Sequence, residues 1–139
     1  MATKNKYLDK TLSQLKAIAV THFHKYIRNR DRGKPCISCG RHTKLQAGHY
    51  YSAGQHPSVR FDPDNVHGQC LQCNYFKHGN LINYSHNIID RIGEKRFKNL
   101  KLKIDLSKRA RFKWSKFYLI DVIEKYKELN KKPPSYEQE

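Results

Sequence analysis

The chain has 139 residues, with 28 Lys and Arg against 12 Asp and Glu, so its formal net charge is +16. Hydrophobic residues make up 37% of the sequence and mean hydropathy is −0.89, which suits one domain with a small core. No apolar run approaches the ~20 residues of a membrane span. A charge this large predicts a polyanionic partner, with nucleic acid ahead of an anionic membrane surface. The N-terminus MATKNKYLDK lacks the apolar stretch of a signal peptide, so we expect a reducing cytoplasm.

The basic residues are unevenly distributed. Residues 1–35 contain nine basic and two acidic side chains, residues 36–89 contain four and two, and the last fifty contain fifteen and eight. A nearly neutral centre therefore lies between two basic arms, an arrangement that suits arms holding phosphates around a central site.

The first expected element is an amphipathic helix over residues 11–31. Thr11 and Gln14 form a capping-box pattern, and apolar residues follow at helical spacing. Gly33 is expected to end this helix.

The centre of the chain predicts two strands between two cysteine knuckles. Residues 43–52 are typical of a strand, residues 58–62 of a second strand, and residues 62–65 (DPDN) of a turn. A short helix is expected from about Leu71, interrupted by Gly79.

The C-terminal half predicts two more helices. One covers residues 80–92 and is closed by Gly93, and the last begins at Ser115 as N-cap. Residues 94–113 are very basic and cannot be assigned, whereas residues 130–139 have the composition of a disordered tail.

Four cysteines form the pattern C-x2-C-x30-C-x2-C. They are Cys36, Cys39, Cys70 and Cys73. In a reducing compartment this spacing predicts a structural zinc site with four thiolates at tetrahedral reach. Two unrelated buried pairs, or a redox thiol pair, are the alternatives. Four sulfur ligands leave no open position, so this metal would not be catalytic.

Three polar residues surround the second knuckle and the first strand. His49 lies on the strand, Asn65 on the loop before the knuckle, and Asn74 at the start of the short helix. Hydrolysis of a phosphodiester needs a base for the water and a divalent cation at the departing oxygen. A strand histidine can supply the base, a central asparagine can hold the loop over its ring, and a helix ligand can carry the cation. Taken singly, such residues more often cap turns or remain partly exposed.

The chain resembles the HNH nucleases, in the zinc-containing ββα-metal form of phage recombination endonucleases. The endonuclease VII type shares the two cysteine pairs with an asparagine directly after the fourth cysteine, and the lambdoid phage NinG (Rap) family is more similar. The resemblance runs from YIRNRDRGKPCISCG through AGHYYSAGQHPSVRFDPDNVHGQCLQCNYFKHGNL to IIDRIG, about residues 26–93, with a looser match in FKWSKFYLIDVIEKYKEL.

The resemblance implies roles for these residues. His49 would be the general base, Asn65 the middle asparagine, and Asn74 the third position and a metal ligand. Members of the family act on branched DNA, including Holliday junctions and D-loops, during phage recombination, and they use Mg²⁺ or Mn²⁺.

Gly48 departs from the pattern, because many HNH sites have a metal-binding Asp at this position. The other candidate ligands are His78, His67 and Asp62, completed by water. His78 would lie one helical turn beyond Asn74, on the same face.

Residues 94–116 carry ten basic side chains with interleaved aromatic residues. This density favours binding of the DNA backbone, with stacking on unpaired bases, over a merely solvated face. The expected DNA contacts are Lys77, Arg96, Lys98, Lys101, Lys103, Arg109, Arg111, Lys113 and Trp114.

The predicted fold is α+β: a small, irregular ββα-metal (HNH-like) core on a four-cysteine zinc site (residues 36–93), with a basic N-terminal helix (1–35) and a basic C-terminal segment, helix and tail (94–139) in one compact domain. The predicted function is a Mg²⁺- or Mn²⁺-dependent endonuclease for branched DNA in the host cytoplasm. Resolution of a four-way junction takes two matched cuts, which a two-fold symmetric homodimer would supply. Other recombination proteins are candidate partners. A zinc-dependent DNA-binding module without catalysis is the alternative, supported mainly by Gly48; the charge alone would also permit an RNA-binding, ribosome-associated protein.

Overall fold

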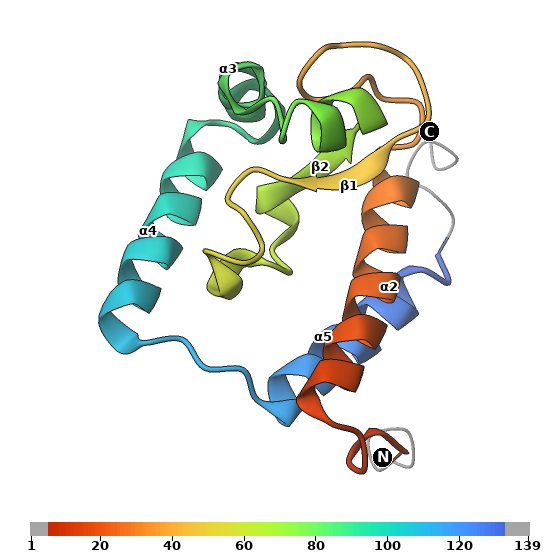
Figure 1. Ribbon diagram of the computed structural model, residues 1–139, viewed down its shortest axis with the longest axis vertical. Helices are drawn as coiled ribbons and strands as arrows, with labels where there is room; N and C mark the ends of the chain where they lie inside the picture. Colours follow the sequence, from red (N-terminus) through yellow and green to blue (C-terminus); the bar gives the residue numbers. More distant parts are fainter. Residues whose placement is uncertain (1–5, 133–139) are drawn as a thin grey trace.

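The computed structural model describes residues 6–132 and combines four long helices with one two-stranded sheet (Figure 1). Its helices and strands in chain order are α2 (Leu12–Arg30), β1 (Gln46–His49), β2 (Val66–Gln69), a π-helix (Gln72–Phe76), α3 (Leu81–Ile92), α4 (Glu94–Ala110) and α5 (Lys116–Leu129). Short 3-10 helices cover Pro57–Val59 and Pro63–Asn65. The fold is therefore α+β, with the small sheet between helices from both ends of the chain.

The N-terminal helix confirms the sequence pattern. The Thr11 hydroxyl accepts a hydrogen bond from Gln14 N, and Gln14 Oε1 accepts one from Thr11 N, which is a complete capping box. Its buried residues recur every four positions: Leu15, Ala19, Phe23 and Ile27. This stripe packs against α5, which lies beside α2 (Figure 1).

The two strands are antiparallel, with Gln46 opposite Gln69 and His49 opposite Val66. The expected second strand at residues 58–62 is wrong, because Pro57 begins a 3-10 helix there. Proline fixes φ near the helical value and cannot donate to a sheet, so it favours this turn over a ladder. The strand that pairs with β1 begins at Val66, four residues after the end of the expected one.

The C-terminal half contains one helix that the sequence left unassigned. Residues 94–110 form α4, whose buried residues Phe97, Leu100 and Ile104 face α3 and the loop before β2. The helices predicted at 80–92 and from Ser115 are confirmed, since Ser115 Oγ accepts from Tyr118 N and α3 ends at Gly93. The tail prediction lies largely outside the described residues.

Two hydrophobic cores lie on either side of the hairpin. One joins α2, α5 and the inner side chains of the hairpin, and the other joins α3 and α4 with Ile37 and Val59. A third, small cluster consists of cysteines with Leu45 packed beside them. The first core contains side chains from all three segments expected from the sequence, residues 1–35, 36–93 and 94–139. Among residues 6–132, no helix is both long and apolar enough to cross a bilayer.

Candidate functional site

The four cysteines come together at one point between the first loop and the π-helix. Their Sγ atoms all lie within 4.8 Å of one another, and Cys39 Sγ is 3.7 Å from Cys70 Sγ. Zn–S bonds of about 2.3 Å in a tetrahedron place sulfur atoms about 3.8 Å apart. Gly40, with φ of +77°, permits the tight turn after the first pair. The cluster can therefore hold a metal ion such as zinc.

Hydrogen bonds from N–H groups further support thiolates in this cluster. Cys70 N donates to Cys36 Sγ, and Asn80 Nδ2 donates to Cys73 Sγ at 3.4 Å. Burial opposes ionisation of Cys36, but backbone N–H donors outweigh it and lower its pKa to about 7. Burial raises the pKa of Cys73 to about 12, so a metal would have to displace the proton from that thiol.

His49 lies at the end of β1, half-buried, with its ring fixed by the backbone. Its Nε2 is 2.9 Å from the Arg60 carbonyl oxygen. A carbonyl can only accept, so Nε2 carries the proton and neutral His49 keeps a lone pair on Nδ1. Burial, and then the charge of Arg60, lower the pKa of His49 despite that hydrogen bond. The ring is therefore neutral near pH 7 and has a basic nitrogen.

Asn65 is fully buried and holds the loop that carries Arg60. Its Oδ1 accepts from Tyr51 N, while its Nδ2 donates to the carbonyls of Tyr51 and Val59. These bonds tie Asn65, just before β2, to Tyr51, just after β1, and to Val59 in the loop between the two strands. Asn65 thus fixes the position of the Arg60 carbonyl, which in turn orients His49.

Asn74 lies on the opposite side of the hairpin from His49. Its Nδ2 donates to Gln46 Oε1 at 2.8 Å. Side chains alternate along a strand, so Gln46 and Gly48 share one face, whereas Ala47 and His49 share the other. Ala47 packs into the core with α2 and α5. The structure therefore does not place the His49 and Asn74 side chains on a common face.

Gly48 has a steric reason for lacking a side chain. A Cβ at this position would lie 2.1 Å from Gln69 Oε1 and 2.8 Å from Gln69 Cβ. The Gln69 side chain is fully buried and donates from Nε2 to Ser38 Oγ and the Gly79 carbonyl. Gln69 thus occupies the space in which a carboxylate at position 48 would lie.

The three substitute ligands do not converge beside Asn74. The π-helix ends at Phe76, and His78 is exposed beyond it with a left-handed φ of 49°, so the expected one-turn spacing is wrong. His67 is buried with Nδ1 3.2 Å from Tyr84 Oη. Asp62 pairs with Lys103 at 2.7 Å.

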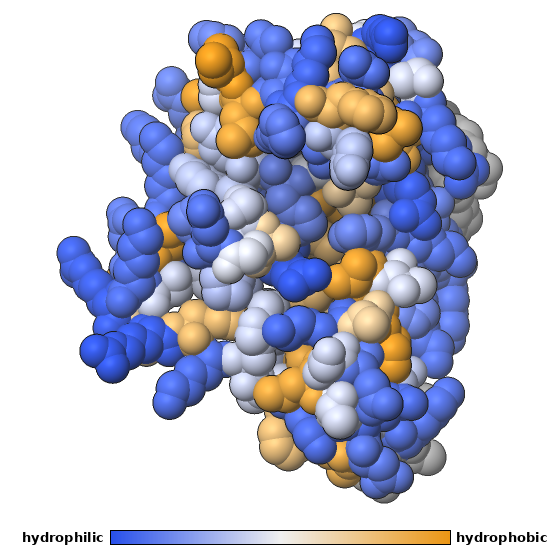
Figure 2. Space-filling model, in the orientation of Figure 1, coloured by the Kyte–Doolittle hydropathy of each residue, from blue (hydrophilic) through white to orange (hydrophobic). Residues whose placement is uncertain are grey.

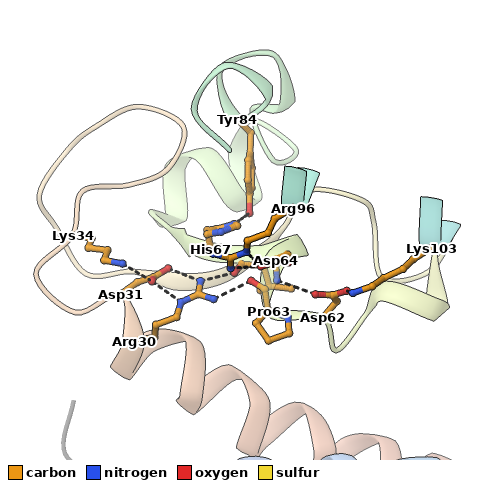
Figure 3. Close-up of polar contacts among 11 residues, drawn as sticks. Arg30, Asp31, Lys34, Asp62, Pro63, Asp64, His67, Tyr84, Arg96 and Lys103 are labelled. Atoms are coloured by element: carbon orange, nitrogen blue, oxygen red, sulfur yellow. Dashed lines mark hydrogen bonds and ion pairs between the residues drawn. The ribbon is translucent and has the colours of Figure 1, made fainter. Parts of the chain in front are cut away.

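Figure 3 shows a polar network beneath the hairpin that sequence reasoning missed. Asp31, fully buried, accepts from Arg30 and from Gly68 N at 2.7 Å. Arg30 also donates to the carbonyls of Pro63 and Val66. Burial opposes ionisation of Asp31, but the bonds from Arg30 and Gly68 lower its pKa. This network attaches the end of α2 to β2, and an Arg-Asp pair at the end of a helix is only a weak sequence signal for it.

The predicted DNA contacts differ in their surroundings. Most are exposed, and Figure 2 shows hydrophilic side chains projecting along the edge that α4 forms in Figure 1. Arg96 and Lys103 instead pair with Asp64 and Asp62. Trp114 is half-buried and packs against the first core, with Lys16 over its ring at 4.7 Å. Trp114 thus contributes to the core, and its stacking on unpaired bases stays a prediction. Arg96 and Lys103 are exposed despite these ion pairs, and the other exposed contacts are Lys77, Lys98, Lys101, Arg109, Arg111 and Lys113.

Comparison with known proteins identifies the family of the chain. Residues 2–134 match the model of the family described as bacteriophage lambda NinG protein. The chain belongs to the NinG family. Proteins named ninG from Escherichia phage 933W and Salmonella phage P22 are each 51% identical to this NinG chain over 71 and 70 residues. The ninG protein of Escherichia phage lambda is 49% identical over 71 residues.

These matches cover only part of each protein. The aligned region is 50%, 49% and 50% of this NinG chain, and 35%, 34% and 35% of the three relatives. The aligned part thus spans about a third of the length of the curated relatives. No solved structure matches the chain.

Proposed function

We propose that this NinG-family chain is a structure-specific endonuclease with an HNH-type core, which cuts branched DNA such as Holliday junctions and D-loops during phage recombination. The arrangement of His49 is the observation that carries the proposal. A half-buried, neutral imidazole has one nitrogen fixed by the Arg60 carbonyl and the other left with its lone pair. This is the state that a general base requires.

The proposed reaction is hydrolysis of one phosphodiester bond. His49 Nδ1 takes a proton from water, and the hydroxide oxygen bonds to phosphorus. The bond from phosphorus to the 3′-oxygen breaks, and the departing 3′-oxygen keeps the bonding electrons and takes up a proton from solvent. Asn65 does not touch the reacting atoms in this scheme. It acts as a positioning residue, through its three hydrogen bonds to Tyr51 and Val59.

Zinc is the metal that we propose for the cysteine cluster, in a structural role. Four sulfur ligands complete a tetrahedral shell and leave no position for water or substrate. Cys70 and Cys73 flank the turn between β2 and the π-helix, so the ion would connect this turn to the first loop.

The residues around Asn74 do not fit a preformed magnesium site. Asn74 Oδ1 is available, because Nδ2 makes the bond to Gln46. Magnesium sites usually include one or two carboxylates. Within residues 6–132, however, the cysteine set is the only group of three or more His, Cys, Asp or Glu that can hold a metal. The Mg²⁺ or Mn²⁺ dependence is therefore proposed from the resemblance to HNH nucleases and not from a ligand cluster in the described residues.

DNA binding is proposed for the exposed basic residues of α4 and the segment that follows it. Lys98, Lys101, Arg109, Arg111 and Lys113 present their charges to solvent, where phosphates can reach them. A homodimer would supply the two matched cuts that a four-way junction requires. The host cytoplasm, where phage DNA recombines, is the proposed location.

A branched-DNA-binding module without catalysis is the second candidate function. Gly48 favours it, since Gln69 fills the space of the missing carboxylate. Such a module would bind junctions through the same basic surface but would leave every strand intact.

The test is incubation of the zinc-loaded chain with a synthetic four-way junction and with a matched linear duplex, each with and without Mg²⁺ or Mn²⁺. The proposal predicts nicks in the junction strands, dependent on the cation, and little cutting of the duplex. Junction binding with no nicks under any condition would favour the binding module.

A further inference from the structure

Two side chains that the general-base role of His49 does not require, those of His24 and Arg60, lie near its ring. His24, on the inner side of α2, lies with its ring centroid 6.0 Å from that of His49. Arg60 follows the 3-10 helix Pro57–Val59, and its carbonyl holds His49. Three elements that are distant in sequence thus bring His24, His49 and Arg60 together, all of them half-buried, and the Arg60 charge is close enough to lower the pKa of both histidines.

Arg60 has an unused donor. Its Nε is buried and has no hydrogen-bond partner, while its guanidinium lies 5.7 Å from the centre of the Phe61 ring. A buried N–H of a charged group without an acceptor is costly, and native proteins rarely leave one unpaired. An acceptor brought by a ligand would satisfy it.

The charged side chains that act on the two imidazoles are positive. Burial, and then His49, Arg28 and Arg60, lower the pKa of His24 to about 4. Both rings are therefore neutral at pH 7 and each carries one N–H, so the positive charge comes from Arg60 and from exposed Arg28. The single N–H of His49 is already bonded to the Arg60 carbonyl, so the donors left for an anion are the N–H of neutral His24 and the Arg60 guanidinium.

We infer that His24 and Arg60 form a binding site for a phosphodiester group immediately beside His49. The Arg60 guanidinium contacts the nonbridging phosphate oxygens, and an imidazole N–H of His24 donates to one of them. This inference rests on the proposed function in one respect, namely that the bound phosphate is the one that is cut. The site lies on the α2 side of the hairpin, which places the reacting phosphate there and not beside Asn74.

Inorganic phosphate is the probe that tests binding without any cleavage. Side-chain proton–carbon NMR signals of His24 and His49 are followed at constant pH and ionic strength as phosphate replaces chloride. We expect saturable shifts of both histidines in the zinc-loaded parent chain. Arg60→Met should weaken the apparent phosphate affinity at least about tenfold, because it replaces the charged donor by an uncharged side chain of similar length. Arg60→Lys should restore part of this affinity.

Two further variants control for charge and for fold. Lys125→Met removes one positive charge from the exposed side of α5 and should leave both phosphate-dependent shifts unchanged. His24→Gln keeps an N–H donor and should bind phosphate better than His24→Ala. Shifts that do not saturate, or equal shifts in the parent and Arg60→Met, would overturn the inference. Zinc content and circular dichroism confirm that each variant is folded.

Cleavage assays on the same variants separate the two proposals. If phosphate binds as expected but the parent never cuts a junction, the anion site stands and the endonuclease proposal fails. If the parent cuts and Arg60→Met cuts equally fast, the anion site is not the site of cleavage and the inference fails while the endonuclease proposal stands.

Discussion

At the scale of single residues, the positions of Asn65 and Gly48 show how the hairpin is specified. Asn65 makes three side-chain hydrogen bonds to the loop before it, and this loop presents the Arg60 carbonyl to His49. Gly48 is required because Gln69 occupies its side-chain space. Both residues act on the site through a neighbour, which explains why motif spacing alone could suggest a role for Asn65 but not the reason for Gly48.

Asn65→Ala should lower the free energy of unfolding by about 3 kcal/mol, because it leaves buried backbone groups of Tyr51 and Val59 without partners. Chemical denaturation of the zinc-loaded protein measures this change. Asn83→Ala, at an exposed position on α3, should cost less than about 0.5 kcal/mol. Equal effects of the two substitutions would mean that Asn65 does not hold the loop.

At the scale of elements, periodic patterns were predictable and irregular ones were not. The capping box of α2 and the N-cap Ser115 of α5 are local signals, and both helices begin where those signals stand. The strand expected at residues 58–62 failed because Pro57 starts a 3-10 helix. Helix α4 escaped prediction because only three buried apolar residues interrupt its basic surface.

The candidate site residues also fall into those that the sequence predicted and those that it did not. Cysteine spacing predicted a cluster that the fold brings together. Motif positions also located His49, Asn65 and Asn74 in the chain, but which face of the hairpin each one occupies depends on the strand register. His24 and Arg60 carried no motif, since their proximity to His49 arises only from packing of α2 and the 3-10 loop.

Removal of the metal should unfold the segment between the two knuckles. Purified protein should contain about one equivalent of zinc per chain, and a strong chelator or Cys73→Ser should abolish the cooperative thermal transition, since metal binding and folding are coupled. Metal analysis and circular dichroism measure this, with zinc added back to the chelated sample as the control. A zinc-free chain with an unchanged spectrum would contradict the structural role.

At the scale of the whole molecule, the fold separates a buried, precisely paired interior from a strongly basic surface. The net charge of +16 is carried mainly outside the two cores. In the interior, Asp31 and His67 are fully buried, and each has a hydrogen-bond partner, as Figure 3 shows. Stability should therefore respond to pH through these interior groups more than through the surface lysines.

The pH dependence of stability has a predictable sign. Burial, and then Arg30, lower the pKa of His67 to about 3 from an ordinary value of 6.5. Below pH 6.5 the unfolded chain binds a proton at this residue that the folded chain does not, so stability falls as pH drops toward 3, by up to about 1.4 kcal/mol per unit. Denaturation at pH 7.0, 6.0 and 5.0 measures the slope, and His67→Gln should make it shallower. An unchanged slope in that variant would rule out His67 as the source.

The general base is the claim on which the proposed function depends, and His49→Ala tests it most directly. The measurement is single-turnover cleavage of one four-way junction by zinc-loaded parent, His49→Ala and His86→Ala, the last removing an exposed histidine of α3. Junction affinity and zinc content should be unchanged in all three, while His49→Ala should cut about 10²–10⁴-fold more slowly and His86→Ala as fast as the parent. Cleavage by His49→Ala at the parental rate would contradict the assignment of His49 as the base.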